Sequence, residues 1–212
     1  MDRTMLFDSK DTLLFIGDSI TDNGRARPVG ELLGLGAGYV SLVNAALGAR
    51  YPETLVRVLN TGCGGNRVTD LAARWQQDVL DLQPDWVSIM IGINDVWRHF
   101  DRAVLSDQVD PEQFETVLTE LVETTKSRVK GIFLMTPFFL EANRDDPMRA
   151  MMDQYGAIVR KIAESKDCRF VDTQAAFDRY LAARPTQSLC GDRVHPNLIG
   201  HQIIADAFLA AI

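Results

Sequence analysis

Three polar residues have the types and the placement that nucleophilic catalysis requires. Ser19 comes directly after an apolar run, so a buried strand is expected to end there and expose the serine hydroxyl. Asp192 and His195 stand three residues apart, where the aspartate can fold back onto the imidazole ring. Because a serine hydroxyl attacks poorly unless an oriented base accepts its proton, we predict Ser19 as nucleophile, His195 as general base and Asp192 as its partner.

Each of these residues also has a simpler interpretation. Serine after Gly-Asp is common in turns, and an aspartate and a histidine just before Pro196 can cap a helix. The catalytic interpretation therefore depends on whether further motifs converge on the same place.

Attack on an ester also requires hydrogen-bond donors for the oxyanion that forms. The stretch Gly62-Cys63-Gly64-Gly65-Asn66 offers backbone N–H groups, and Asn94 offers a side-chain amide. Together with the N–H of Ser19, these groups would provide three donors. Glycines after a strand usually only form a turn, so this cluster gains weight from the other motifs.

Apolar runs and apolar periodicity predict an alternation of strands and helices. Continuous apolar runs predict five strands, at residues 12–16, 55–59, 86–91, 131–135 and 169–171. Helical spacing predicts helices around residues 39–47, 68–79, 114–122, 148–162 and 173–183, and a last helix opened by Pro196. The methionines at helical spacing in 148–152 are expected in the core. Residues 22–38 are too irregular for a helix and are expected to form a long loop.

This alternation predicts a three-layer α/β/α fold with a five-stranded parallel sheet and right-handed crossovers. The 212 residues suit one domain spanning 1–212. In such a fold the motifs at Ser19, Gly62–Asn66 and Asn94 each follow a different strand, and Asp192 and His195 follow the last one. Polar motifs that converge on one edge of a sheet indicate a site there.

Composition excludes several classes of partner. The formal net charge is -7 and the basic residues are scattered among acids, so we expect neither nucleic acid nor a membrane surface as a partner. Charged and apolar residues alternate at the start of the chain, and no run approaches membrane-spanning length. We therefore expect a cytoplasmic protein.

Four blocks of the sequence resemble the SGNH (GDSL-like) hydrolase family, whose fold is flavodoxin-like. The blocks are Gly17-Asp18-Ser19, the glycine stretch, Gly92-Ile93-Asn94-Asp95 and Asp192-Arg193-Val194-His195, in matching order and spacing over nearly the whole chain. Three further stretches look most like the carbohydrate-esterase branch that deacetylates xylan and xylo-oligosaccharides: 11–22, 86–97 and 136–174.

The resemblance implies a role for each matching residue. It implies the same triad as above, with the N–H groups of Ser19 and a glycine of the second block, and the amide of Asn94, as oxyanion donors. Relatives commonly have Gly-Ile-Ser-Gly in the second block, which makes Gly65 the matching position and leaves Gly64 as an alternative.

Other polar and aromatic residues receive secondary predictions. Asp18 and Asp95 are expected to hold their loops by hydrogen bonds. Neither His99 nor His201 is expected to be the base. Four residues are predicted to line the substrate cleft, with packing or plain exposure as the alternative: Arg25, Arg27, Trp97 and Phe138.

We therefore expect a serine esterase that removes acetyl groups from small carbohydrates without a cofactor or a metal ion, and relatives imply a homo-oligomer. The loops at 22–38, 97–110 and 137–146 are polar around a few aromatics and offer little apolar surface for a fatty chain. One alternative is the same machinery acting on lysophospholipids, thioesters or other short acyl esters. Another is a metal-dependent phosphoesterase, with Asp18, Asp22, Asn94, Asp95 and His195 as ligands. A third alternative is a binding module that kept the fold and lost catalysis. Nothing supports it, because no member of the triad is missing.

Overall fold

Strand β1 (Thr12–Gly17) lies inside a largely parallel sheet. It pairs with β3 (Arg57–Asn60) on one side and β4 (Trp86–Met90) on the other, so that Leu14 stands opposite both Leu59 and Val87. Strands β5 (Gly131–Met135) and β6 (Arg169–Val171) continue the sheet beyond β4, again in parallel. The computed structural model describes residues 5–101 and 108–212, so the part of the predicted loop at 102–107 lies outside the described residues.

A sixth strand makes the expected count of five wrong. Strand β2 (Gly30–Glu31) pairs antiparallel with β3 at the edge and completes the order β2-β3-β1-β4-β5-β6. It lies in the stretch that the sequence predicted as an irregular loop. Two residues are too few to show an alternating pattern, so periodicity could not reveal this strand.

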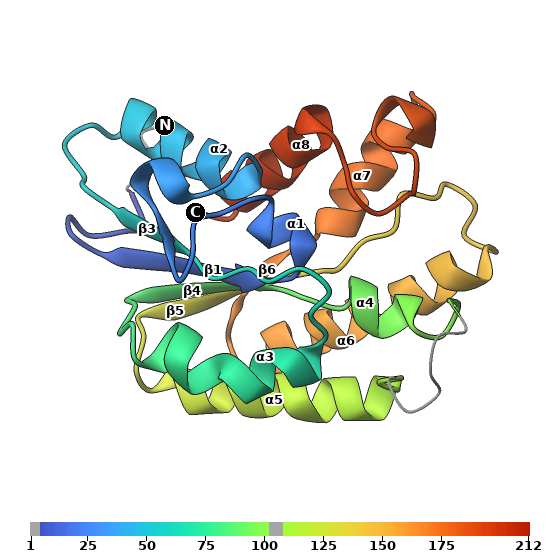
Figure 1. Cartoon of the computed structure of the whole chain (residues 1–212), viewed down its shortest axis with the longest axis horizontal. Helices are drawn as coiled ribbons and strands as arrows, with labels where there is room; N and C mark the ends of the chain where they lie inside the picture. The colour runs from blue at the N-terminus through green and yellow to red at the C-terminus, as the bar shows by residue number, and fades with distance from the viewer. Residues whose placement is uncertain (1–4, 102–107) are drawn as a thin grey trace.

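Helices cover both faces of the sheet, which confirms the three-layer fold (Figure 1). On one face lie α2 (Tyr39–Arg50), α7 (Thr173–Leu181) and α8 (Leu198–Leu209), and α8 contacts the other two. On the other face lie α3 (Val68–Trp75), α5 (Pro111–Lys126) and α6 (Pro147–Ser165), with α5 between its neighbours. Helix α3 runs on into a π-helical turn at Gln76–Leu80, and the described residues form 3-10 turns at Leu32–Gly34 and Thr186–Ser188.

Helix ends follow ordinary capping chemistry. Helices α5 and α6 begin with proline, and the carboxylates of Asp110 and Asp146 accept hydrogen bonds from their first turns. The last helix begins at Leu198, two residues later than the proline suggested, because the side chain of Asn197 accepts from the N–H groups of Ile199 and Gly200.

The core lies between the sheet and its helices. Aromatic rings fill much of one side. The ring centroid of Phe208 lies 5.0 Å from that of Phe15 and 4.6 Å from that of Phe133. On α6, Met148 and Met152 are buried, as predicted, and Met151 is partly buried and packs against the core. Among the described residues, none of the helices combines the length and the apolar character that a membrane span needs.

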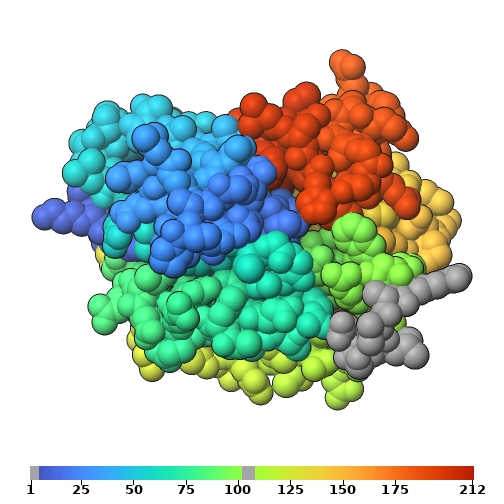
Figure 2. Space-filling view, viewed as in Figure 1, coloured from blue at the N-terminus to red at the C-terminus, as the bar shows by residue number. Residues whose placement is uncertain are grey.

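The carboxyl ends of the strands carry the polar motifs. The short helix α1 (Ser19–Asp22) follows β1, the glycine stretch follows β3, and the short helix α4 (Ile93–Trp97) follows β4. In the space-filling view, blue segments from the start of the chain adjoin red segments from its end (Figure 2). This adjacency allows residues 176 positions apart to meet.

Candidate active site

Ser19 is held at the first position of α1, immediately beyond β1. The carboxylate of Asp18 accepts a hydrogen bond from the N–H of Ile20 at 2.9 Å and so caps this short helix. Gly17 makes the tight exit from the strand possible, because a Cβ atom there would lie 2.4 Å from the carbonyl oxygen of Met90. The serine hydroxyl is therefore presented by a turn that a larger residue at position 17 would disrupt.

The structure brings the three predicted triad residues into one hydrogen-bonded chain. Oγ of Ser19 lies 2.9 Å from Nε2 of His195, and Nδ1 of His195 lies 2.7 Å from Oδ2 of Asp192. Since a carboxylate only accepts hydrogen bonds, the imidazole proton is on Nδ1 and Nε2 is left to accept the serine proton. This arrangement can generate a serine nucleophile.

Asp192 is tied to the backbone as well as to the ring. Its Oδ1 accepts from the N–H groups of Val194 at 3.0 Å and of His195 at 2.9 Å. Burial raises the pKa of Asp192, but the hydrogen bonds from His195 and Val194 outweigh it and lower the pKa to about 2. The partner of the imidazole thus stays ionised at neutral pH, although the side chains of His195 and Asp192 are 47% and 45% exposed.

The two candidate glycines differ in what their N–H groups do. The N–H of Gly64 donates to Oδ2 of Asp22 at 3.2 Å. Within the described residues, the N–H groups of Gly65 and Ser19 have no acceptor in the protein. Gly65 has a φ of +79°, which glycine adopts without strain. Availability therefore favours Gly65 over Gly64 as the backbone donor.

Asn94 is fixed close to the same loop. Its Nδ2 donates one hydrogen to the carbonyl oxygen of Asn66 at 3.0 Å, which orients the amide and leaves the second hydrogen for a ligand. The side chain is buried at the start of α4. With the N–H groups of Ser19 and Gly65, the site holds three donors suited to an oxyanion.

The aspartates beside the motifs hold loops, as predicted. Asp18 caps α1, and Oδ1 of Asp95 accepts from the N–H of Val68 at 3.0 Å, at the start of α3. Both side chains are almost fully buried, and burial raises the pKa of each to about 7. Asp22 pairs with Arg27. In the described parts of the chain, no group of three His, Cys, Asp or Glu side chains is placed to hold a metal ion.

The four residues predicted to line the cleft have different environments. Trp97 lies beside the site, with its ring centroid 6.4 Å from that of His195. Arg27 is half exposed and pairs with Asp22, which also binds the glycine loop. Arg25 and Phe138 are placed differently from the prediction.

Arg25 is buried and donates to the carbonyl oxygens of Gly62 at 2.6 Å and Pro28 at 2.5 Å, so it holds the loop together. Phe138 is fully buried, with its ring 4.4 Å from that of Phe177. An arginine surrounded by backbone carbonyls and a ring in the core do not form a cleft wall, so these two predictions are corrected.

Among the described residues, neither of the other histidines makes a hydrogen bond to Ser19. Nε2 of His99 is 3.1 Å from the carbonyl oxygen of Val109, and His201 is buried beneath Tyr39, whose N–H donates to its Nδ1 at 3.2 Å. Sequence reasoning gave no role to Arg193, although it lies between Asp192 and His195 in the chain.

Comparisons with known proteins identify a family and several relatives. Residues 15–203 match the GDSL-like lipase/acylhydrolase family. The chain is 54% identical over 211 residues to an acetylxylan esterase of Geobacillus stearothermophilus, covering 98% of this chain and 96% of that protein. The crystal structure of that enzyme, Axe2, superposes with a TM-score of 0.96, over the same shares of the two chains.

Two further findings concern the solved structures. Structures of the same enzyme described as catalytic mutants replace a serine, a histidine or an aspartate by alanine. An α/β hydrolase from the metagenome of Lake Arreo, LAE5, is 53% identical, with a TM-score of 0.96 over 98% of this chain and 97% of that one.

Proposed function

The chain belongs to the GDSL-like lipase/acylhydrolase family, and from that premise we propose that it is a serine esterase that removes O-acetyl groups from carbohydrates such as xylo-oligosaccharides. The observation that carries this proposal is the hydrogen-bonded chain of Ser19, His195 and Asp192 beside two backbone N–H groups and one amide hydrogen that have no acceptor among the described residues. Its acetylated-sugar substrate follows from the relationship to an acetylxylan esterase.

The first half of the reaction transfers the acetyl group to the protein. Oγ of Ser19 attacks the carbonyl carbon while Nε2 of His195 accepts the hydroxyl proton, and the carbonyl π electrons move onto oxygen. The N–H groups of Ser19 and Gly65 and the amide of Asn94 stabilise this oxyanion. When the intermediate collapses, the proton on Nε2 passes to the departing sugar oxygen, leaving acetyl-Ser19.

The second half releases acetate. A water molecule takes the place of the sugar, loses a proton to Nε2 of His195 and attacks the acetyl carbonyl, so that the same donors stabilise a second oxyanion. Collapse returns the proton to Oγ of Ser19. Throughout, Asp192 keeps the imidazole in the tautomer with Nδ1 protonated and stabilises the imidazolium form. Apart from the substrate and water, this chemistry uses only side chains and backbone groups of the chain.

Acyl-chain length separates this proposal from lysophospholipid or thioester hydrolysis. A methylene group that stays in water forgoes about 0.8 kcal/mol of burial free energy, so a site without an apolar trough gives no advantage to longer chains. We expect kcat/KM to fall from acetyl through butyryl to octanoyl p-nitrophenyl esters, and acetylated xylo-oligosaccharides to be turned over well. A profile that rises with chain length would reject the carbohydrate assignment and leave the triad in place.

Chelation tests the metal-dependent alternative. We expect EDTA to leave activity unchanged and a serine-directed phosphonate to add covalently at Ser19, as mass spectrometry of the labelled peptide would show. Activity lost on chelation and restored by a divalent metal would favour a phosphoesterase.

We further propose a cytoplasmic location and a homo-oligomeric assembly with small molecules as the other partners. The exposed Leu32, Leu33 and Leu55 give the edge of the sheet apolar surface that a second copy could cover. Cell fractionation and light scattering of the purified protein test the two proposals, which secretion or a monomer at micromolar concentration would contradict.

A further inference from the structure

Arg193 has a backbone conformation that is unusual for a residue with a side chain. Its φ is +62°, in the left-handed region that glycine adopts freely. It occupies the turn in which Oδ1 of Asp192 accepts hydrogen bonds from the N–H groups of Val194 and His195. A glycine would form this turn with less strain, so the presence of arginine indicates that its side chain has a task.

The side chain of Arg193 binds the segment between β5 and α6 (residues 136–146), which is yellow in Figure 1. Its Nη1 donates to Oε2 of Glu141 at 2.9 Å and lies 3.3 Å from Oδ2 of Asp146. The guanidinium carbon lies 4.7 Å from the ring centroid of Phe139. In addition, the carbonyl oxygen of Arg193 accepts from the N–H of Leu140 at 2.9 Å. One residue thus makes two ionic contacts, a cation–π contact and a backbone hydrogen bond.

Buried side chains and hydrogen bonds fix this segment to the rest of the protein. Phe139 and Leu140 are buried, and Oε1 of Gln174 accepts from the N–H of Phe139 at 2.8 Å. Oδ1 of Asp146 caps α6 through the N–H of Met148 at 2.9 Å. The contacts of Arg193 therefore reach the ends of two helices, α6 and α7, and do not end on a free loop.

The loop that carries Asp192 and His195 is anchored at its two ends, where Thr186 donates to the carbonyl oxygen of Leu140 at 2.7 Å and the N–H of Asn197 donates to the carbonyl oxygen of Leu189 at 2.8 Å. Between these ends, about half of the side chains of Asp192 and of His195 is exposed, and the contacts to the rest of the protein come from the buried side chain of Val194 and from Arg193. We infer that Arg193 is a positioning residue: by holding this loop against Glu141, Asp146 and Phe139, it keeps His195 at hydrogen-bond distance from Ser19. This inference rests on the proposed function of the triad.

The expected kinetic consequence is specific. His195 must accept the proton of Ser19 and return it to the leaving oxygen, so displacement of its ring lowers the rate of both chemical steps. Because Arg193 does not contact Ser19 or the oxyanion donors, substrate binding should be little affected. Loss of the contacts made by the Arg193 side chain should lower kcat by roughly ten- to a hundredfold and leave KM within about twofold.

Three variants separate the side chain from the backbone. Arg193→Ala removes the side-chain contacts and keeps a Cβ atom at positive φ. Arg193→Gly removes the same contacts and also relieves the strain. We expect both to lose kcat on p-nitrophenyl acetate to a similar extent, and Arg193→Lys to recover part of it by restoring a positive charge near the two carboxylates. Glu141→Gln, which keeps a hydrogen-bond acceptor, should give a smaller loss.

The matched control is Arg144→Ala. Arg144 lies in the same segment, is largely exposed and pairs with Asp178, and we expect unchanged kcat and KM. The rate of covalent phosphonylation of Ser19 should fall with kcat in the Arg193 variants, and this readout is independent of any sugar substrate. Failure of the sugar assignment would thus leave the inference standing.

Two results would overturn the inference. One is wild-type kcat and wild-type phosphonylation rate in both Arg193→Gly and Arg193→Ala. The other is a rise in KM at constant kcat, which would make Arg193 a substrate contact. If Arg193→Ala does not fold, the glycine, lysine and Glu141 variants provide the same comparison.

Discussion

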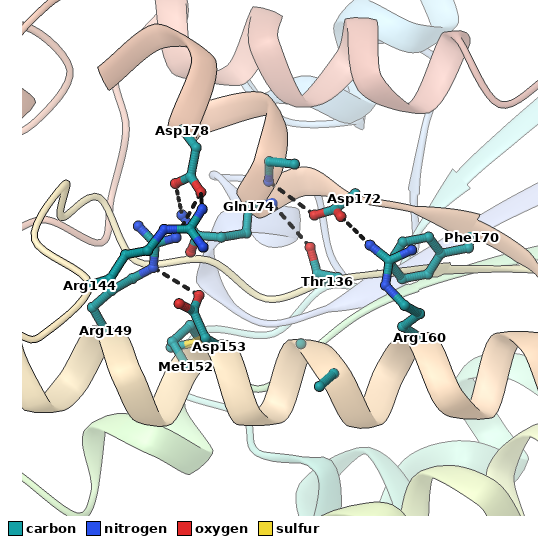
Figure 3. A pocket seen from close by; sticks show the side chains of 13 residues that line it. Thr136, Arg144, Arg149, Met152, Asp153, Arg160, Phe170, Asp172, Gln174 and Asp178 are labelled. Carbon is teal, nitrogen blue, oxygen red and sulfur yellow. Dashed lines mark hydrogen bonds and ion pairs between the residues drawn. The ribbon is translucent and has the colours of Figure 1, made fainter. Parts of the chain in front are cut away.

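The carboxyl edge of the sheet carries two concentrations of polar side chains, and they differ in how completely their hydrogen bonds are made. The triad lies beyond β1 and next to β3 and β4. Beyond β5 and β6, a cleft of about 250 Å³ opens between α6 and α7, and none of its lining residues belongs to the triad (Figure 3). Its arginines and aspartates face one another in ion pairs.

Arg149 shows the difference most clearly. It is fully buried, and it donates to Asp153 at 2.8 Å, to Asp178 at 2.8 Å and to the carbonyl oxygen of Glu141 at 2.5 Å. At the triad, by contrast, the N–H groups of Ser19 and Gly65 have no acceptor among the described residues. Chemistry needs oriented groups that still lack a partner, so unpaired donors identify the reactive region better than the volume of a cleft does.

Removal of the nucleophile or the base should give the largest effect. Ser19→Ala and His195→Ala should each lower kcat by about a millionfold, and the double variant should be little worse, because the two residues act as one unit. His99→Ala is the control and should keep most activity, since its ring contacts the carbonyl oxygen of Val109. Residual activity must first be corrected for traces of wild-type enzyme, which active-site titration measures. Substantial turnover that remains in either single variant would contradict the assignment.

Arg149→Ala should have the opposite profile. Removing a buried cation that serves two carboxylates should lower the free energy of unfolding by about 3 kcal/mol, while kcat per folded molecule changes less than about threefold. Arg160→Ala is the matched control: its pair with Asp172 is half exposed and its guanidinium lies over the ring of Phe170, so we expect a smaller loss, of about 1 kcal/mol. Urea unfolding measures both. A large loss of kcat in folded Arg149→Ala would show that the two regions are coupled.

Asn94→Ala tests the donors on the reactive side. Its amide hydrogen is assigned to charge that develops only in the transition state, so kcat should fall roughly a hundred- to a thousandfold with KM nearly constant. Asn94→Asp should be at least as severe, because it places an acceptor beside the oxyanion. If KM rises instead while kcat is kept, Asn94 binds the ground state of the substrate.

Much of this arrangement could be predicted because it depends on local patterns. Continuous apolar runs located β4 and β5 almost residue by residue, and the rule that ligands bind at carboxyl ends of parallel strands brought Ser19, Asn94 and His195 together. Strand β2 could not be predicted, because it has no apolar pattern of its own. It is a strand because it pairs with β3.

The errors at the site have a similar cause. Arg25 looks like a surface cation in the sequence, and only the folded loop supplies the carbonyl oxygens that surround it. Phe138 follows a strand end like a wall residue, but α7 places Phe177 against it. Contacts made by distant, irregular segments decide both cases, and apolar periodicity carries no information about them.

His201 provides the smallest expected effect on activity and a sharp test of the distinction between paired and unpaired groups. Burial, and secondarily the nearby His195, lowers the pKa of His201 to about 4. Between pH 4 and 6.5 the unfolded chain therefore binds a proton that the folded chain does not, so this residue makes the free energy of unfolding rise with pH, by at most about 1.4 kcal/mol per unit.

Asp18 and Asp95 act in the opposite direction, because their raised pKa values make stability fall as pH rises from about 4 to 7. The measurement must therefore be a difference, wild type minus His201→Gln, in which these contributions cancel. We expect the difference to grow in favour of the wild type from pH 4 to 6.5 and then to level off, with kcat reduced less than about threefold because the ring contacts Tyr39 and Asn23 and not Ser19. A difference that does not change with pH would mean that the ring is protonated equally in both states, and the buried, paired histidine would then be no different from an exposed one.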